Sequence, residues 1–126
     1  MVDFTRYIPP NASAEMRRRV SKALSVNPSR RPGGEVLSTP ALVMLMERTA
    51  VRACQSHLPP GFTTVGYHVD IRHLAPLPVG QEVRVLATLQ ALEGNKLTFR
   101  VEAYGPDGKR IGEGTHRRAI IPIRER

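Results

Sequence analysis

Apolar residues follow two different periods along the chain, and each period predicts a different kind of element. From Ala41 to Cys54 the sequence has no glycine or proline, and the first two turns are apolar on every side. This pattern is typical of a buried helix rather than a surface helix. Thr39 suits the N-cap of such a helix, Pro40 suits its first helical position, and Pro59-Pro60-Gly61 follows its end. We therefore expect one long buried helix.

Downstream of this helix the period changes to two, which is typical of β-strands. Apolar positions alternate in four successive segments, at residues 65–73, 83–89, 97–103 and 111–123. In the first segment one face is expected to carry Val65, Tyr67, Val69, Ile71 and His73, and the other Gly66, His68, Asp70 and Arg72. Short turns rich in glycine and proline join the segments and predict an antiparallel meander. The predicted fold class is α+β, with an antiparallel sheet wrapped around one long central helix.

The N-terminal third has a less regular pattern. Residues 4–8 are expected to form a short strand that Pro9-Pro10 ends, and residues 27–34 a loop. Residues 12–25 fit either a helix or an edge strand, because Met16, Val20 and Leu24 have helical spacing while the stretch around them also suits a strand. We treat residues 1–34 as an extension or first strand of a single domain that covers residues 1–126.

The charge of the chain narrows the choice of partner. The 126 residues include 19 Lys and Arg against 11 Asp and Glu, a net charge of +8, which favours a ligand that carries phosphate. The absence of tryptophan weighs against a single-stranded nucleic-acid groove. No apolar run approaches the roughly 18 residues of a membrane span, and the N-terminus does not resemble a signal peptide. With a single cysteine, Cys54, we expect a cytoplasmic protein that binds neither nucleic acid nor membrane.

Glu47 is the residue that departs most clearly from its surroundings. It lies inside the apolar helix, where an ionised carboxylate is seldom found without a partner or a function. The structural alternative is an ion pair with Arg48, Arg52 or an arginine of a second chain. Cys54 is interpreted as a small core residue. His116 lies near Gly114, where two backbones can approach closely, and we assign it a structural role.

Several short segments, taken together, resemble one known family. They are Val36–Val43, Leu45–Glu47, Thr64–Gly66, Ile71–Pro76 and Gly112–Arg118. In order and spacing they are similar to the fluoroacetyl-CoA thioesterase-like group of hotdog-fold acyl-CoA thioesterases, over about residues 36–121. This resemblance implies the hotdog fold, hydrolysis of an acyl-CoA thioester, catalytic roles for Thr39, Glu47 and His73, and a substrate-binding role for the matching glycine, Gly66.

The resemblance also has implications for the substrate. The loop over residues 29–34 lacks the bulky aromatic residues found in the fluoroacetyl-specific enzyme, so we expect a different or larger acyl group. Arg72, Arg117 and Arg118 lie near the matching motifs and are candidates to bind the phosphates of coenzyme A, the alternative being a solvated arginine face. Coenzyme A would enter as part of the substrate, and no separate cofactor or metal is expected.

Helix geometry limits how the three candidate residues can work together. Eight helical residues advance about 12 Å and rotate by about 80°, so Thr39 and Glu47 share a face without being neighbours. A third group or a second subunit must bridge them, and His73 suits a proton shuttle. Two mechanisms stay open: acylation of Thr39 with His73 as base, or attack by Glu47 or by a water that it activates.

The sequence is also compatible with two other functions, and it predicts that the chain forms an oligomer. The same fold could bind acyl-CoA without hydrolysing it, and the basic charge could belong to a protein associated with nucleic acid. One helix does not cover a whole curved sheet, so we expect a sheet edge or face to pair with a second copy. The sequence therefore predicts a homodimer or a higher homo-oligomer.

Overall fold

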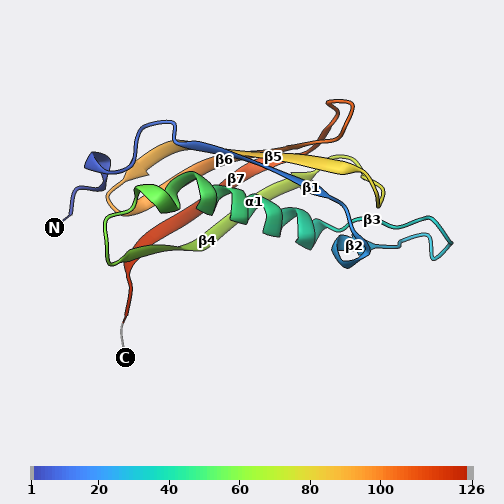
Figure 1. Cartoon of the computed structure of the whole chain (residues 1–126), viewed down its shortest axis with the longest axis horizontal. Coiled ribbons are helices and arrows are strands. Elements are labelled where there is room, and N and C mark those ends of the chain that lie inside the picture. The colour runs from blue at the N-terminus through green and yellow to red at the C-terminus, as the bar shows by residue number, and fades with distance from the viewer. Residues whose placement is uncertain (1, 125–126) are drawn as a thin grey trace.

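Five antiparallel strands form one sheet, and a single long helix lies along one face of it (Figure 1). The computed structural model describes residues 2–124. The helix is α1 (Thr39–Cys54), and the strands are β1 (Ser13–Arg19), β4 (Phe62–His73), β5 (Glu82–Glu93), β6 (Lys96–Tyr104) and β7 (Arg110–Pro122). This arrangement confirms the predicted α+β fold with one long helix against an antiparallel sheet.

The N-terminal third is built from short elements. They are two 3-10 turns, η1 (Phe4–Arg6) and η2 (Lys22–Leu24), and a two-stranded ribbon of β2 (Ser25–Val26) and β3 (Val36–Leu37). A third 3-10 turn, η3 (Gln55–His57), follows α1. The strand predicted over residues 4–8 is wrong, because Asp3 accepts the N–H and O–H of Thr5 and closes a 3-10 turn instead. Residues 13–19 form an edge strand, and residues 27–34 form the predicted loop.

The predicted four-strand meander is wrong at β4. The strand order is β1-β5-β6-β7-β4, so only β5, β6 and β7 follow one another in space as they do in sequence. The second edge of β5 is already occupied by β1, where Met16 lies opposite Val85. Strand β4 therefore pairs with β7 at the other end of the sheet and forms an edge strand.

A bulge in β4 changes which of its residues face the helix. Gly66 lies opposite Arg118 and Val69 lies opposite His116, so Tyr67 is an extra residue in β4. Directly opposed residues share a face, and each side of a bulge keeps its own alternation. The face toward α1 consequently carries Gly66, Val69, Ile71 and His73, while Val65 lies on the other face. The predicted faces of this strand are therefore wrong on the N-terminal side of Tyr67.

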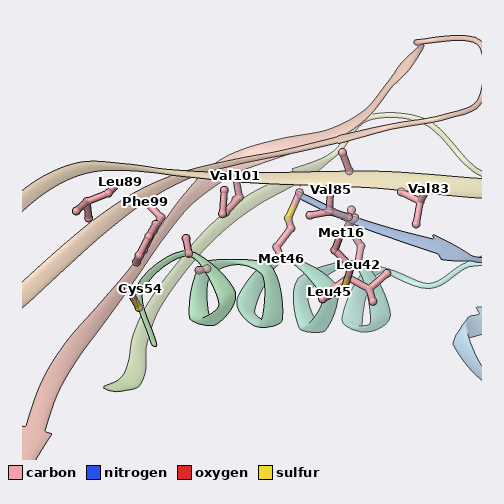
Figure 2. Close-up of a cluster of buried hydrophobic side chains, with 14 of the residues drawn as sticks. Met16, Leu42, Leu45, Met46, Cys54, Val83, Val85, Leu89, Phe99 and Val101 are labelled. Atoms are coloured by element: carbon pink, nitrogen blue, oxygen red, sulfur yellow. The ribbon is translucent and has the colours of Figure 1, made fainter. Parts of the chain in front are cut away.

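The core lies between α1 and the sheet (Figure 2). The buried residues of the helix are Ala41, Leu42, Leu45, Met46, Thr49, Ala50, Ala53 and Cys54. They pack against inward residues of the strands, including Met16, Val83, Val85, Phe99 and Val101. Burial raises the pKa of the Cys54 thiol and outweighs the opposing effects of Arg118 and Thr64, in keeping with a core role. None of the helices within residues 2–124 is long and apolar enough to span a membrane.

The sequence predicts a helix that is buried on every side, but in the structure one side of α1 is only partly covered. Val43, Met44 and Glu47 are only partly covered, and Thr39 is exposed. The sheet covers the helix mainly through β5 and β1, while Thr39 and Glu47 lie beside His73 and Gly66 of the edge strand β4. The helix therefore retains an incompletely covered side beside an edge strand.

Gly114 is expected to be essential for the pairing of β4 with β7. A Cβ at this position would lie 2.0 Å from the backbone oxygen of Asp70 and 2.9 Å from Cα of Ile71, so Gly114→Ala must push the two strands apart. We expect a loss of about 3 kcal/mol in the free energy of unfolding, measured by urea denaturation. Gly105→Ala is the matched control, because the atoms nearest to its Cβ would lie 3.4 Å away or farther. Equal denaturation midpoints for the two variants would contradict this packing.

Candidate active site

The start of α1 leaves the Thr39 hydroxyl available for chemistry. Ser38 is the N-cap, and its side chain accepts the N–H of Ala41 at 3.2 Å. Thr39 and Pro40 are therefore the first two helical residues, and the predicted cap is wrong by one position. Since capping does not occupy the Thr39 hydroxyl, its Oγ1 lies 2.7 Å from Nδ1 of His73, at the end of β4.

His73 is held in a partly desolvated position beside Thr39. Its Nε2 is buried and has no hydrogen-bond partner within the described part of the chain. Burial lowers the pKa of His73 below its ordinary value, and a smaller effect of the Ala75 backbone opposes this shift. The imidazole is therefore neutral at pH 7. A neutral imidazole whose Nδ1 lies at hydrogen-bond distance from a hydroxyl can accept its proton.

A shallow pocket, open to the surface, lies beside the Thr39–His73 pair. Its volume is about 300 Å³. Besides the pair itself, its lining residues are Val26, Val36, Leu37, Leu74, Ala75 and Pro76. These residues come from the β2–β3 ribbon on one side and from the segment after β4 on the other. The pair is thus placed at the wall of a largely apolar space.

Glu47 belongs to a second cluster, which is organised around Arg118. The guanidinium of Arg118 donates from Nε to Oγ1 of Thr64 at 2.9 Å and from Nη2 to the Thr64 carbonyl at 3.0 Å. Its Nη1 lies 3.2 Å from Nε2 of His116 and 3.9 Å from Oε2 of Glu47. Arg118 is 7% exposed, whereas the Glu47 side chain is 41% exposed. Within the described part of the chain, the ion pair of Glu47 is therefore made with Arg118, and the predicted partners Arg48 and Arg52 are wrong.

The charge of Arg118 is buried but well partnered. Burial lowers the pKa of Arg118, while Cys54 and Glu47 act in the opposite direction. An arginine nevertheless stays protonated in a protein. The cluster therefore presents a fixed positive charge beside the partly exposed carboxylate of Glu47.

Gly66 leaves an opening at the same cluster. A Cβ on Gly66 would lie 3.0 Å from Cε1 of His116, 3.1 Å from Nη1 of Arg118 and 3.2 Å from Oε2 of Glu47. Any larger residue would therefore press on all three side chains. The glycine next to the bulge keeps the Glu47 carboxylate accessible from the free edge of β4.

The structure places the predicted site residues in separate groups. Thr39 and His73 meet at the start of α1, and Glu47 lies near Gly66 and Arg118, about 12 Å further along the helix axis. Arg72 lies opposite Glu113 on β7, so its alternation places it on the face away from α1, and it is exposed. Arg117 is also exposed and alternates with the buried Arg118.

The free edge of β4 runs between these two groups. Every residue from 65 to 70 is exposed, and three of them, Val65, Tyr67 and Val69, are large and apolar. Tyr67 is 50% exposed even though the Lys96 ammonium lies 4.8 Å from the centre of its ring. An edge strand also has backbone N–H and C=O groups without ladder partners. This edge therefore has the composition of a pairing surface.

Sequence reasoning missed two members of the Arg118 cluster. Thr64 was not considered, and His116 received only a structural role. The signal was present in β7, where Gly112, Gly114, His116, Arg118 and Ile120 alternate on one face. Since Gly112, Gly114 and Ile120 are glycine or apolar, the alternation places Arg118 on the core face of β7 rather than on its surface face. No three His, Cys, Asp or Glu side chains gather as a metal site within residues 2–124.

The comparisons with known proteins agree on one family. The model of the family described as fluoroacetyl-CoA-specific thioesterase matches residues 20–124. A fluoroacetyl-CoA thioesterase from Streptantibioticus cattleyicolor is 42% identical over 90 residues, which cover 71% of this chain and 63% of that protein. The match thus spans less than two thirds of that relative's length.

Solved structures give the same result for the fold. A structure of fluoroacetyl-CoA thioesterase superposes with a TM-score of 0.80 at 32% identity, covering 91% of this chain and 89% of that chain. A thioesterase superfamily member from Thermus thermophilus gives 0.83 at 32% identity, with coverage of 93% and 86%. A hot-dog-like protein from Thermanaerovibrio acidaminovorans gives 0.85 at 28% identity, with coverage of 96% and 89%. The fold is therefore the hotdog fold, and the chain belongs to the fluoroacetyl-CoA-specific thioesterase family.

Proposed function

We propose that the protein is an acyl-CoA thioesterase whose active sites form between two copies of the chain. Membership of the family supports the reaction class. A structurally similar variant of fluoroacetyl-CoA thioesterase has been solved in complex with fluoroacetate and CoA, the two products of such a reaction. The observation that carries the proposal is the 2.7 Å contact between Thr39 and His73, which lies slightly more than two helical turns from Glu47.

The proposed dimer pairs the free edge of β4 with the same edge of a second chain. In an antiparallel pair centred at Asp70, with Tyr67 as the extra residue of each strand, His73 lies opposite Gly66 of the partner subunit and opposed residues share a face. Two antiparallel α1 helices centred at Val43 bring Thr39 toward Glu47 of the partner subunit. Both elements thus require the same two-fold axis, which would also cover the exposed apolar residues of β4.

Each proposed residue has a role in hydrolysis of the thioester to a free acid and CoA. In one route Thr39 Oγ1 attacks the carbonyl carbon while His73 Nδ1 takes its proton. The C–S bond breaks, the thiolate receives that proton, and a water activated by the partner's Glu47 then cleaves the acyl ester. In the other route the partner's Glu47 takes a proton from water and the water oxygen attacks the carbonyl carbon directly. The C–S bond breaks, and the proton passes from Glu47 through the Thr39–His73 pair to the departing thiolate. Mass spectrometry of an acid-quenched reaction distinguishes them by an acyl group on Thr39.

The binding residues divide between the two ends of the substrate. Arg72 and Arg117 are exposed, which supports a role for them at the phosphates of CoA. Arg118 is committed to Thr64 and His116, which supports a role beside Glu47 and Gly66 instead. The apolar pocket at Thr39 and the absence of aromatic residues in the 29–34 loop support an acyl group larger than fluoroacetyl. Because CoA arrives with the substrate, the proposed reaction uses no separate cofactor.

Removal of the proposed catalytic groups should abolish turnover without unfolding the chain. We expect wild-type protein to release free thiol from at least one acyl-CoA in a panel of increasing acyl length. Glu47→Gln and His73→Asn should each lower kcat at least about 100-fold. Glu93→Gln, in an exposed position of β5, and His57→Asn, in η3, are matched controls that should retain wild-type rates. Tight binding of acyl-CoA without thiol release would instead support a non-catalytic binding module.

The proposed dimer should depend on β4. Val69→Lys places a charge in the centre of the exposed apolar stretch, and we expect it to give monomers in analytical ultracentrifugation together with a loss of thioesterase activity. Val79→Lys replaces an exposed valine outside the strands and should remain dimeric and active. A monomeric Val69→Lys variant with full activity would contradict the shared site.

A further inference from the structure

His116 is almost fully buried beside Arg118 and Glu47, and its surroundings fix where its proton lies. It is 1% exposed. Its Nε2 lies 3.2 Å from Nη1 of Arg118, and a guanidinium nitrogen can only donate. Nε2 must therefore be the acceptor. The proton of the neutral ring is then on Nδ1, which donates to the His68 carbonyl at 2.9 Å.

Burial, and to a lesser extent the charge of Arg118, favours this neutral form. Arg118 faces it from its own strand, Glu47 from α1 and His68 from β4, while its neighbour on β6 is the apolar Phe99. Burial lowers the pKa of His116, and the positive charge of Arg118 adds to this effect against smaller opposing effects of the His68 backbone and Glu47. A protonated ring would point an N–H at the guanidinium and would break the contact with Arg118.

The bonds of Arg118 show what the contact with His116 achieves. Thr64 accepts from Nε and Nη2 and fixes one side of the guanidinium. His116 is the acceptor for Nη1, the nitrogen that lies 3.9 Å from Oε2 of Glu47 and would lie 3.1 Å from a Cβ on Gly66. The His116 ring thus sets the orientation of the one guanidinium nitrogen that faces the open end of the cluster.

We propose that His116 is a positioning residue for the thioesterase reaction: as a neutral Nδ1–H tautomer it orients the Arg118 guanidinium and thereby fixes the charge beside the Glu47 carboxylate. This role rests on the proposed function. It differs from the structural role of tying β7 to the bulge in β4, which would need only the bond from Nδ1 to the His68 carbonyl.

Two substitutions separate the positioning role from the structural role. The side-chain oxygen of glutamine can take the place of Nε2 and accept from Arg118, whereas the amide nitrogen of asparagine can take the place of Nδ1 and donate to His68. We expect His116→Gln to retain kcat within about threefold. His116→Asn should lower kcat about tenfold or more at little change in KM, because it leaves a charged donor without its acceptor next to Glu47. Thermal unfolding and ultracentrifugation of both variants monitor fold and dimer.

The outcomes distinguish this role from the function on which it rests. Equal kcat for the two variants, or a larger loss in His116→Gln, would overturn the positioning role while leaving the thioesterase intact. A wild-type chain that hydrolyses no acyl-CoA would overturn the function itself and this role with it. A measurement on the wild-type protein is independent of variant folding: ¹⁵N–¹H spectra of the imidazole should show protonation at Nδ1 of His116, and protonation at Nε2 would overturn the proposal.

Discussion

The fixed rise per residue of α1 is the constraint on which the arrangement of the active site depends. Thr39 and Glu47 are separated by about 12 Å along the helix axis. The buried side of the helix is fixed in the core by Leu42, Leu45 and Met46, so neither end can move toward the other. Each of the two residues instead contacts its own neighbours in the sheet. Thr39 contacts His73, and Glu47 lies beside Gly66 and Arg118. A second chain related by a two-fold axis is the arrangement that we propose to unite them.

A single extra residue in β4 makes this arrangement possible. Gly66 and His73 are seven positions apart, so in a regular strand they would lie on opposite faces. The bulge at Tyr67 restores a common face, and both residues are directed toward the helix. The bulge lies in the stretch of β4 where every residue is exposed, next to the edge that we propose as the dimer interface. Local backbone geometry thus connects the pairing surface to the two halves of the site.

Local patterns predicted most of the elements but not how they meet. The helix over 41–54 and the hairpin strands β5, β6 and β7 follow from period and turn residues, which act within a few positions. The position of β4 could not be predicted in this way, because β1, which is distant in sequence, pairs with the edge of β5 that β4 would otherwise occupy. The bulge at Tyr67 has no signature in an alternating sequence, and the face assignment failed there. In the site, Glu47 was indicated by its apolar surroundings, and its association with Thr39 and His73 came from family resemblance. The Thr64–Arg118–His116 contacts depend on a buried arginine, a residue type that composition alone assigns to the surface.

The central claim is that Thr39 and His73 of one chain work with Glu47 of the other, and mixing two inactive variants tests it most directly. Glu47→Gln and His73→Asn chains carry their defects in different halves of the site, so a mixed dimer would contain one site with both defects and one with none. Random mixing of equal amounts should restore about a quarter of wild-type activity, since about half of the dimers are mixed and each has one intact site. Mixed dimers that form and stay inactive would show that all three residues act within one chain and would contradict the account.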